Sequence, residues 1–236
     1  MFIISEISPQ FSGDIATAEQ MILQSKLGGA EAVKVQLYDP TQFNKPASHA
    51  MSYETLEHLR DFGKHHGIPV FATPFHAKFL DWCVKLDLEY MKVAARMHVQ
   101  FPELTRDIMQ VGKTTFVSIP ADMEAEDVEK ITIAKHAIYL YCVVKYPTLL
   151  EEFQMPDFQN SRFDGISDHT LGNSAAMFAS AHGARYLEKH FTLRKSFQRT
   201  GEMAHLCSMD QQDLLDIKNT ATEFEILRRA TGKDVG

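Results

Sequence analysis

Two histidines stand at points where short apolar runs give way to polar residues. His169 follows the run that begins at Ile166, and His190 follows the run that begins at Leu187. They lie 21 residues apart with a helical segment between them, so one strand–helix unit separates them. If both runs are parallel strands, the two imidazoles share one edge of the sheet and can bind one metal ion. The alternative is a pair of hydrogen-bonded structural histidines.

Charged side chains also interrupt apolar runs. Lys34 lies within Ala-Val-Lys-Val and Lys92 within Tyr-Met-Lys-Val. An unpaired ammonium in such a place is costly, so a bound anion is the favoured explanation for each lysine. Glu6 lies in the first apolar run, where the same argument about the cost of an unpaired charge applies to its carboxylate. Glu188 fits two roles equally well: a carboxylate that orients a metal-binding histidine, or a catalytic group.

The polar residues at the ends of the predicted strands form one set if the strands are parallel. Lysines would supply positive charge and hydroxyl groups would complete an oxygen-binding cradle, which suits a phosphorylated or carboxylated small molecule beside a divalent metal. The set comprises Glu6, Lys34, Gln36, Thr73, Lys92, Ser118, Tyr146, Ser167, Asp168, His169, Glu188 and His190.

The elements that must position this set alternate regularly along the chain. Short apolar runs alternate with longer amphipathic stretches about eight times, which is typical of strand–helix units that wind a parallel sheet. Eight units favour closure into a (β/α)8 barrel, an α/β fold whose chemistry lies at the carboxyl ends of its strands. The expected strands are Phe2–Glu6, Ala32–Gln36, Pro69–Thr73, Tyr90–Ala94, Thr114–Ser118, Ala137–Cys142, Gly165–Ser167 and Tyr186–His190.

The amphipathic stretches predict the helices. Two connections, Tyr38–Ser52 and Thr192–Ser208, exceed the usual length for this fold and are candidates for substrate-binding or lid segments. The expected helices are Asp14–Leu27, Tyr53–His65, Lys78–Lys85, Phe101–Gln110, Ala125–Lys135, Asn173–Ala181 and Met209–Arg229, with a less defined piece at Met155–Phe158.

Composition limits the class of protein. The chain has 236 residues, 44% of them hydrophobic, which is enough for the core of one barrel domain over residues 1–236. Its formal charge of −7, without a basic tract, argues against a nucleic-acid partner. No apolar run approaches the roughly 20 residues of a membrane span. Three cysteines beside apolar segments, and an amino terminus without a basic leader, favour a cytoplasmic protein with reduced thiols.

Several motifs together resemble one known family, the N-acetylneuraminate (sialic acid) synthases. They occur in collinear order from residue 2 to about residue 225, and they match the barrel domain of those enzymes. Ser-Asp-His-Thr-Leu-Gly and Glu-Lys-His-Phe-Thr are the most specific of them. The motifs are Ile4–Ile7, Gly13-Asp14, Gly29–Gln36, Thr73–Phe75, Tyr146–Thr148, Ser167–Gly172 and Glu188–Thr192.

The resemblance implies a metal-dependent condensation of phosphoenolpyruvate with an N-acetylated aminosugar aldehyde, which yields a nine-carbon α-keto acid and phosphate. It implies that His169 and His190 bind the divalent ion, expected to be Mn²⁺ with Mg²⁺ or Co²⁺ as alternatives. It places Glu6 where the family handles water or protons. It also implies that the phosphoenolpyruvate subsite includes Lys34, Thr73, Lys92, Ser118, Tyr146 and Ser167. Gln36, at the end of the second expected strand, is a further substrate-binding candidate.

The chain departs from the family pattern at three places. Ala95-Arg96 replaces a small hydroxyl residue and a glycine, and Arg96 is a candidate anion clamp in their stead. Val144 stands where an asparagine is usual, with Lys145 beside it as a possible replacement. The stretch Thr200–His205 lacks the usual Gly-Pro-Asp, so either Glu202 replaces the sugar-binding aspartate or that group is missing, with Ala204 nearby.

The family usually continues into a small antifreeze-like domain that closes the sugar site across a dimer. We expect no such domain in this chain, and a homodimer by resemblance. A separate chain would then supply the closing domain, or the sugar-binding half works differently. Two alternatives stay open: the same chemistry on a different aldose or phosphosugar, and a non-catalytic barrel that serves as a binding or assembly module for a complete synthase.

Overall fold

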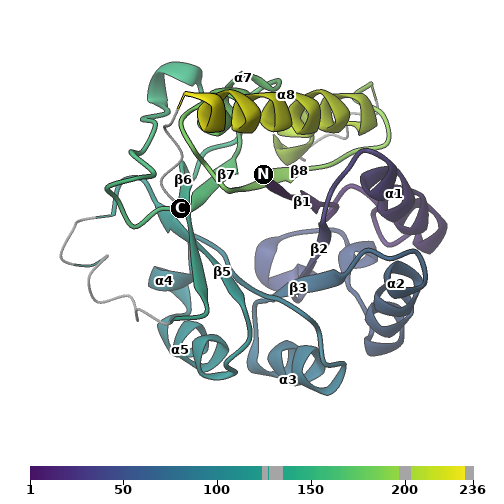
Figure 1. Cartoon of the computed structure of the whole chain (residues 1–236). Helices are drawn as coiled ribbons and strands as arrows, with labels where there is room; N and C mark the ends of the chain where they lie inside the picture. The colour runs from purple at the N-terminus through teal and green to yellow at the C-terminus, as the bar shows by residue number, and fades with distance from the viewer. Residues whose placement is uncertain (124–126, 128–134, 197–202, 232–236) are drawn as a thin grey trace.

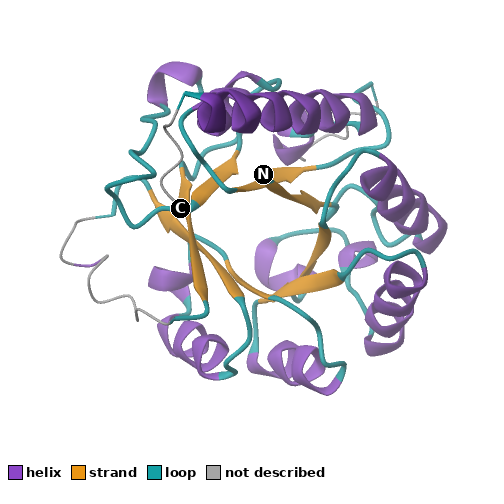
Figure 2. Ribbon diagram, viewed as in Figure 1, coloured by secondary structure: helices purple, strands orange, loops and turns teal. Residues whose placement is uncertain are grey.

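The chain folds into a closed barrel of eight parallel strands, surrounded by helices (Figures 1 and 2). The computed structural model describes residues 1–123, 127, 135–196 and 203–231. Strand order follows chain order, and β1 closes the barrel by pairing with β8. The strands are β1 (Phe2–Glu6), β2 (Ala32–Leu37), β3 (Val70–Pro74), β4 (Met91–Val93), β5 (Thr115–Pro120), β6 (Ala137–Cys142), β7 (Gly165–Asp168) and β8 (Tyr186–His190). The predicted (β/α)8 barrel is confirmed.

An aromatic cluster fills the barrel interior at the amino ends of the strands. Its rings pack at centroid distances of 5.5 to 5.9 Å in stacked, tilted and edge-on pairs. Ile4, Ala32 and Leu140 are fully buried against it. We call this group the aromatic plug; its rings are Phe2, Phe71, Tyr90, Phe116 and Tyr186.

The same strands carry polar side chains at their carboxyl ends. Side chains two residues apart on a strand point to the same face, so residues two positions beyond the interior apolar layer also point inward. Glu6 is the register partner of Lys34 across β1 and β2. The interior of the barrel is therefore apolar at the amino ends of the strands and polar at their carboxyl ends. The apolar and polar members of each pair are Ile4 and Glu6, Ala32 and Lys34, Tyr90 and Lys92, Phe116 and Ser118, and Tyr186 and Glu188.

The helices cover the outside of the barrel, and most begin at a polar capping residue. Asp14, Ser52 and Asp210 accept backbone N–H bonds at the starts of α1, α2 and α8. The helices are α1 (Ile15–Leu27), α2 (Tyr53–His65), α3 (Ala77–Lys85), α4 (Met97–Gln100), α5 (Pro102–Gln110), α7 (Ser174–Ala181) and α8 (Gln211–Ala230).

The helix predictions need two corrections and one qualification. No helix forms at Met155–Phe158; a 3-10 turn at Leu150–Glu152 precedes that segment instead. The short α4 was not expected, because four residues are too few to establish a helical period. Most of the expected helix Ala125–Lys135 lies outside the described residues.

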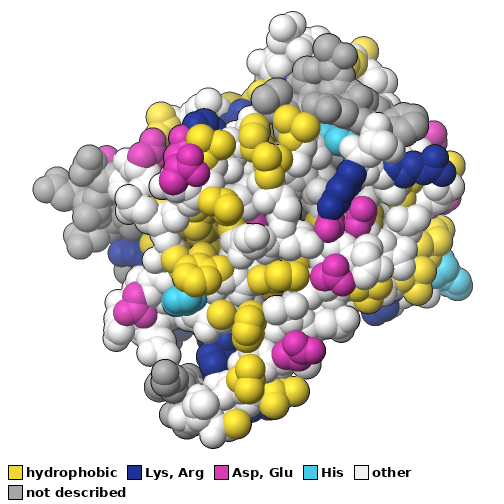
Figure 3. Space-filling view, turned by 90° about the horizontal axis from the view of Figure 1, so that it is seen from above, with side chains coloured by type: hydrophobic (Ala, Val, Ile, Leu, Met, Phe, Trp, Pro, Cys, Tyr) yellow, Lys and Arg dark blue, Asp and Glu magenta, His cyan; other side chains and the backbone are white. Residues whose placement is uncertain are grey.

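The two long connections contain short 3-10 helices: η1 (Pro40–Phe43) and η2 (Ala47–His49) in the first, and η4 (Met203–Cys207) in the second. On the face formed by α7 and α8, hydrophobic side chains alternate with charged ones (Figure 3). Phe178, Ile226 and Leu227 are among the exposed apolar residues. In the described part of the chain, no helix combines the length and apolar character needed to cross a membrane.

Candidate active site

Four buried charged residues form one network at the carboxyl ends of the strands. The ammonium of Lys34 contacts the carboxylate of Glu6 and lies 3.2 Å from Oε1 of Glu188. The ammonium of Lys92 lies 3.3 Å from Oε2 of Glu188. Glu188 therefore bridges the two lysines. The network has two positive and two negative charges and little contact with solvent.

Burial and the mutual charges shift the pKa values of the network in different directions. Burial raises the pKa of Glu6, despite the nearby Lys34 ammonium. Burial alone would also raise that of Glu188, but Lys34 and Lys92 bring the pKa of Glu188 down to about 2. Burial lowers the pKa of Lys92, whereas for Lys34 the two carboxylates outweigh burial and raise the pKa. Glu188 is thus a permanent anion, and Glu6 is the carboxyl group better suited to exchange a proton.

These ion pairs change the interpretation of the two lysines. The sequence favoured a bound anion as the partner of each ammonium, but the protein itself supplies carboxylates to both. Hydroxyl groups complete the contacts, because Lys34 donates to Thr73 (3.1 Å) and Lys92 donates to Ser118 (2.7 Å). The lysines are therefore held in place before any ligand binds.

His169 is oriented by the backbone of the residue that follows β6. Its Nδ1 atom lies 2.9 Å from the carbonyl oxygen of Val143. A carbonyl only accepts, so Nδ1 carries the proton and Nε2 keeps a lone pair. Burial lowers the pKa of His169 to about 4, which leaves the ring neutral at pH 7. Both features are those of a metal-binding imidazole.

His190 is oriented by a buried amide, that of Gln10. The amide oxygen faces Ser208 (3.0 Å), because this orientation lets the NH₂ group donate to the backbone oxygens of Ser8 (2.9 Å) and Ile7 (3.1 Å). The same amide atom lies 3.4 Å from Nδ1 of His190, and as an oxygen it favours the tautomer that carries the proton on Nδ1. Burial, and then the His169 ring, hold the pKa of His190 well below its usual value.

The two imidazoles fit a labile divalent ion. Their ring centroids lie 6.0 Å apart, and the Val143 carbonyl leaves Nε2 of His169 with a lone pair. In the described residues, no group of three or more His, Cys, Asp and Glu side chains is placed to hold a metal. The other ligands would then come from water or substrate, which leaves positions for a reacting oxygen.

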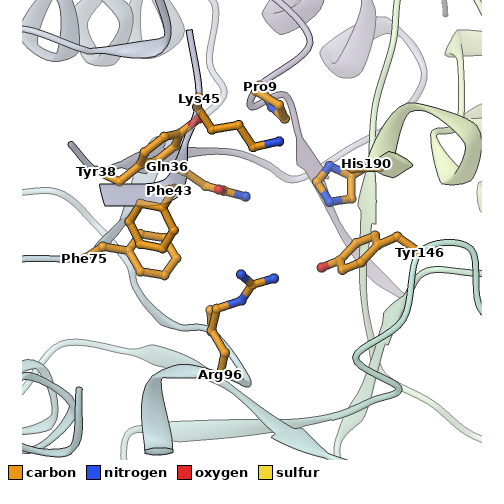
Figure 4. Close-up of a pocket in the computed structure, with 11 residues that line it drawn as sticks. Pro9, Gln36, Tyr38, Phe43, Lys45, Phe75, Arg96, Tyr146 and His190 are labelled. Carbon is orange, nitrogen blue, oxygen red and sulfur yellow. The ribbon is translucent and has the colours of Figure 1, made fainter. Parts of the chain in front are cut away.

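Two connected cavities lie above the network. The inner one is lined by Lys34, Lys92, Glu188, His169 and hydroxyl residues that include Thr73, Ser118 and Ser167. The outer one has a volume of about 280 Å³ (Figure 4). Both are lined by Gln36, Phe75, Ala94, Arg96, Tyr146 and His190. The outer cavity is therefore the entrance to the inner one.

Tyr146 and Arg96 mark the boundary between the cavities. The Tyr146 ring stacks on His169 at a centroid distance of 4.0 Å, and burial raises its pKa. The Arg96 side chain points into the outer cavity, towards Tyr146 (Figure 4). The anion-clamp prediction for Arg96 therefore has a suitable location.

Other predicted residues lie elsewhere. Asp168 forms a buried ion pair with Lys189 (2.7 Å) and lines neither cavity, so its contribution is structural. Lys145 pairs with Glu152 and does not replace an asparagine at position 144. Val144 lines the inner cavity and Ala204 the outer one. Glu202 lies outside the described residues.

The loops supply further residues of the site that could not be recognised from their sequence. Gln10 follows β1, and Tyr38, Phe43 and Lys45 belong to the long connection after β2. The length of that connection marked it as a substrate-binding segment, but nothing in its composition distinguished these side chains. The aromatic wall of the outer cavity comes from Tyr38, Phe43 and Phe75, whose centroids lie 5.3 to 6.3 Å apart.

Fold and site together define a (β/α)8 barrel of the enzyme type, with a buried charged network and two imidazoles at the carboxyl ends of its strands. The sequence profile of the NeuB family matches residues 41–233, and the chain belongs to that family. Its relatives are synthases of sialic acids and similar sugars, and it is a carbon–carbon bond-forming enzyme of this type.

Curated relatives cover most of the chain. Pseudaminic acid synthase of Campylobacter jejuni is 27% identical over 84% of this chain and 67% of its own length. N,N'-diacetyllegionaminic acid synthase of Legionella pneumophila is 25% identical over 95% of this chain and 72% of its own length. The solved N-acetylneuraminic acid synthetase of Leptospira borgpetersenii superposes with a TM-score of 0.86 at 23% identity, over 96% of this chain and 84% of its own. That superposition supports the fold.

Proposed function

We propose that this chain condenses phosphoenolpyruvate with a sugar aldehyde, by preference an aminosugar, to give a nonulosonic α-keto acid and phosphate. In the balanced reaction, C3 of phosphoenolpyruvate bonds to the aldehyde carbon, water adds at C2, and the phosphate leaves. The proposal treats residues 1–236 as one catalytic barrel domain. Two copies of the chain associate as a homodimer in this proposal, which sedimentation analysis of the purified protein can check.

The observation that carries the proposal is the bridge of Glu188 between Lys34 and Lys92 beneath the inner cavity. This bridge fixes two ammonium groups at 3.2 and 3.3 Å from one carboxylate, with Arg96 at the cavity entrance. Phosphoenolpyruvate carries a phosphate and a carboxylate, which fixed cations bind without further ordering of the side chains.

The protein's own groups have separate tasks in this reaction. Lys34, Lys92 and Arg96 bind the anionic groups of phosphoenolpyruvate, and Ser118 and Thr73 hold the lysines. Glu6, whose pKa is raised, transfers the proton of the water that adds at C2. Glu188 is an anion next to the carbon at which positive charge develops. Tyr146 stacks on His169 and forms part of the wall that excludes bulk water.

The metal site belongs to the same proposal. His169 and His190 would hold a divalent ion, with Mn²⁺ as the first choice and Mg²⁺ or Co²⁺ as alternatives. When bound, such an ion supplies Lewis-acid polarisation of the aldehyde oxygen. The acceptor stands beside these imidazoles in the outer cavity, with its carbon chain against the aromatic wall.

The experiment is manganese-dependent release of phosphate from phosphoenolpyruvate, measured with a panel of sugar aldehydes. The comparison variant carries His169→Ala and His190→Ala. A matched control carries His65→Ala and His66→Ala, which removes two histidines at the end of α2. We expect release by the wild type and by the control, and none by the site variant. Wild-type protein that releases no phosphate with any aldehyde contradicts the proposal.

A second candidate function is a non-catalytic binding or assembly module that works with a complete synthase. The observation in its favour is that Ala95 and Val144 give the inner cavity apolar atoms where polar contacts to phosphoenolpyruvate would be expected. Tight metal binding and co-purification with a synthase, without any turnover, would support this candidate over the first.

A further inference from the structure

The outer cavity contains two cationic side chains, Lys45 and Arg96, and neither pairs with a carboxylate of the described residues. Both point into the cavity, from opposite sides (Figure 4). Within the described residues, neither side chain forms an ion pair or a hydrogen bond, and no Asp or Glu lines this cavity. This contrasts with Lys34 and Lys92, whose ammonium groups are neutralised by Glu6 and Glu188.

Lys45 is placed by the backbone of its loop. Asp39 caps the η1 turn by accepting the N–H of Thr41 (2.9 Å). Asn44 then takes a left-handed conformation (φ 50°), which reverses the chain and lets the N–H of Lys45 donate to the carbonyl of Pro40 (2.9 Å). The loop therefore holds the Lys45 side chain at the rim of the cavity before a ligand arrives.

The charges of phosphoenolpyruvate do not account for Lys45. Arg96 lines both cavities, whereas Lys45 lines the outer one and not the inner one. A ligand in the inner cavity meets Lys34, Lys92 and Arg96. The positive charge of Lys45 consequently faces the space left for the second substrate.

The chemistry of the outer cavity favours an anionic second substrate. An uncharged sugar presents hydroxyl groups that both donate and accept, and it needs partners of both kinds. Lys45 and Arg96 only donate, and they carry charge. A phosphate or carboxylate only accepts, so it matches both side chains. The aromatic wall of Tyr38, Phe43 and Phe75 borders the same space and suits the C–H groups of a sugar chain.

We propose that the acceptor is an anionic sugar, with a phosphate or a carboxylate at the end distant from its aldehyde, and that Lys45 binds this group. The inference rests on the proposed function and narrows its substrate class. In this arrangement the aldehyde end lies beside Tyr146 and the imidazoles, and the anionic end lies at the part of the rim that Lys45 lines.

The test compares three acceptors with one carbon skeleton: the neutral aldose, its terminal phosphate and its uronic acid. Each is assayed with phosphoenolpyruvate and Mn²⁺ against the wild type, Lys45→Met and Lys45→Arg. Lys64→Met, on the exposed side of α2, is the matched control. We expect at least one anionic acceptor to exceed the neutral aldose about tenfold or more in kcat/KM. The anionic acceptor with the higher kcat/KM identifies whether the group beside Lys45 is a phosphate or a carboxylate.

Lys45→Met should raise the KM of the anionic acceptor about tenfold or more, with a much smaller effect on the neutral aldose and on the KM of phosphoenolpyruvate. Lys45→Arg should restore most of the affinity, and Lys64→Met should behave as the wild type. A neutral aldose that is used as well as both anions, or equal losses for charged and neutral acceptors in Lys45→Met, would overturn the inference.

A binding measurement separates this inference from the proposed function. If no acceptor is turned over, titration calorimetry of the sugar phosphate and the uronic acid into phosphoenolpyruvate-loaded protein still tests whether Lys45 binds an anionic sugar. Binding by the wild type that is lost in Lys45→Met supports the anion site even though the proposed reaction fails. No binding of either anion overturns the inference.

Discussion

The ammonium of Lys92 lies 3.3 Å from Oε2 of Glu188, a buried oxygen without a hydrogen bond in the described part of the chain. Their attraction is thus ionic and depends on the full charge of the carboxylate. Glu188 also contacts Lys34, so the removal of its charge leaves two buried ammonium groups with fewer partners.

Glu188→Gln should therefore destabilise the protein by about 3 kcal/mol at pH 7, in the range for breaking a buried ion pair. Urea unfolding measures the loss. Glu152→Gln, which removes a surface partner of Lys145, is the matched control and should change stability little. Equal stability of the two variants would show that the bridge contributes nothing.

The same carboxylate predicts an acid-sensitive stability. The pKa of Glu188 is about 2 in the folded state against 4.5 for the unperturbed group, so its contribution is complete above pH 4.5 and is lost as the pH falls towards 2. At 1.36 kcal/mol per pKa unit, the contribution is about 3 kcal/mol. The stability difference between the wild type and Glu188→Gln should shrink over this pH range. A difference that stays constant from pH 7 to pH 3 contradicts the assignment.

Gln10→Met tests the orientation of His190. The change removes the amide oxygen that accepts the Nδ1 proton, while the side chain keeps a similar length. Loss of such an orienting partner typically costs 10 to 100-fold in metal affinity, and we expect Mn²⁺ binding to weaken by about that factor. Electron paramagnetic resonance of free Mn²⁺ measures the affinity, and ¹⁵N resonances of the histidines report the tautomer.

Gln110→Met, at the exposed end of α5, is the control for that experiment. It should leave both the affinity and the histidine spectrum as in the wild type. If Gln10→Met also leaves the tautomer of His190 unchanged, the amide does not orient the ring.

The buried pair of Asp168 and Lys189 should affect stability and not substrate binding. Lys189→Met leaves a fully buried carboxylate without its cation, and we expect a loss of about 3 to 5 kcal/mol in the free energy of unfolding. Adding Asp168→Asn should recover part of this loss, since the buried charge is then gone. The double variant should bind phosphoenolpyruvate with wild-type affinity, because neither residue lines a cavity. Weakened binding would give the pair a role in the site.

Much of the barrel could be predicted from sequence because its signals are periodic. Short apolar runs marked the strands, and the two-residue alternation determines which of their side chains point inward. Lys34, Lys92 and Glu188 were therefore found by type and position. Their pairing could not be predicted, since it depends on side-chain directions across separate strands. The carboxylate partners of the two lysines were consequently missed, and a bound anion beside these lysines stays a prediction.

The loop residues of the site could not be found in this way. Lys45 reaches the outer cavity because Asn44 reverses the chain in a left-handed conformation. Gln10 reaches His190 because β1 and β8 are neighbours in the closed barrel. Both placements follow from the path of the chain in three dimensions, for which one sequence contains no periodic signal.

The aromatic plug closes the barrel interior at the amino ends of the strands. The inner cavity lies between this floor and the outer cavity, so a molecule that occupies the outer cavity blocks the way out as well as the way in. Under the proposed function, such a site imposes an order of binding, in which phosphoenolpyruvate enters before the sugar. A sugar that binds first would block access to the inner cavity. Excess sugar should therefore be a competitive inhibitor with respect to phosphoenolpyruvate.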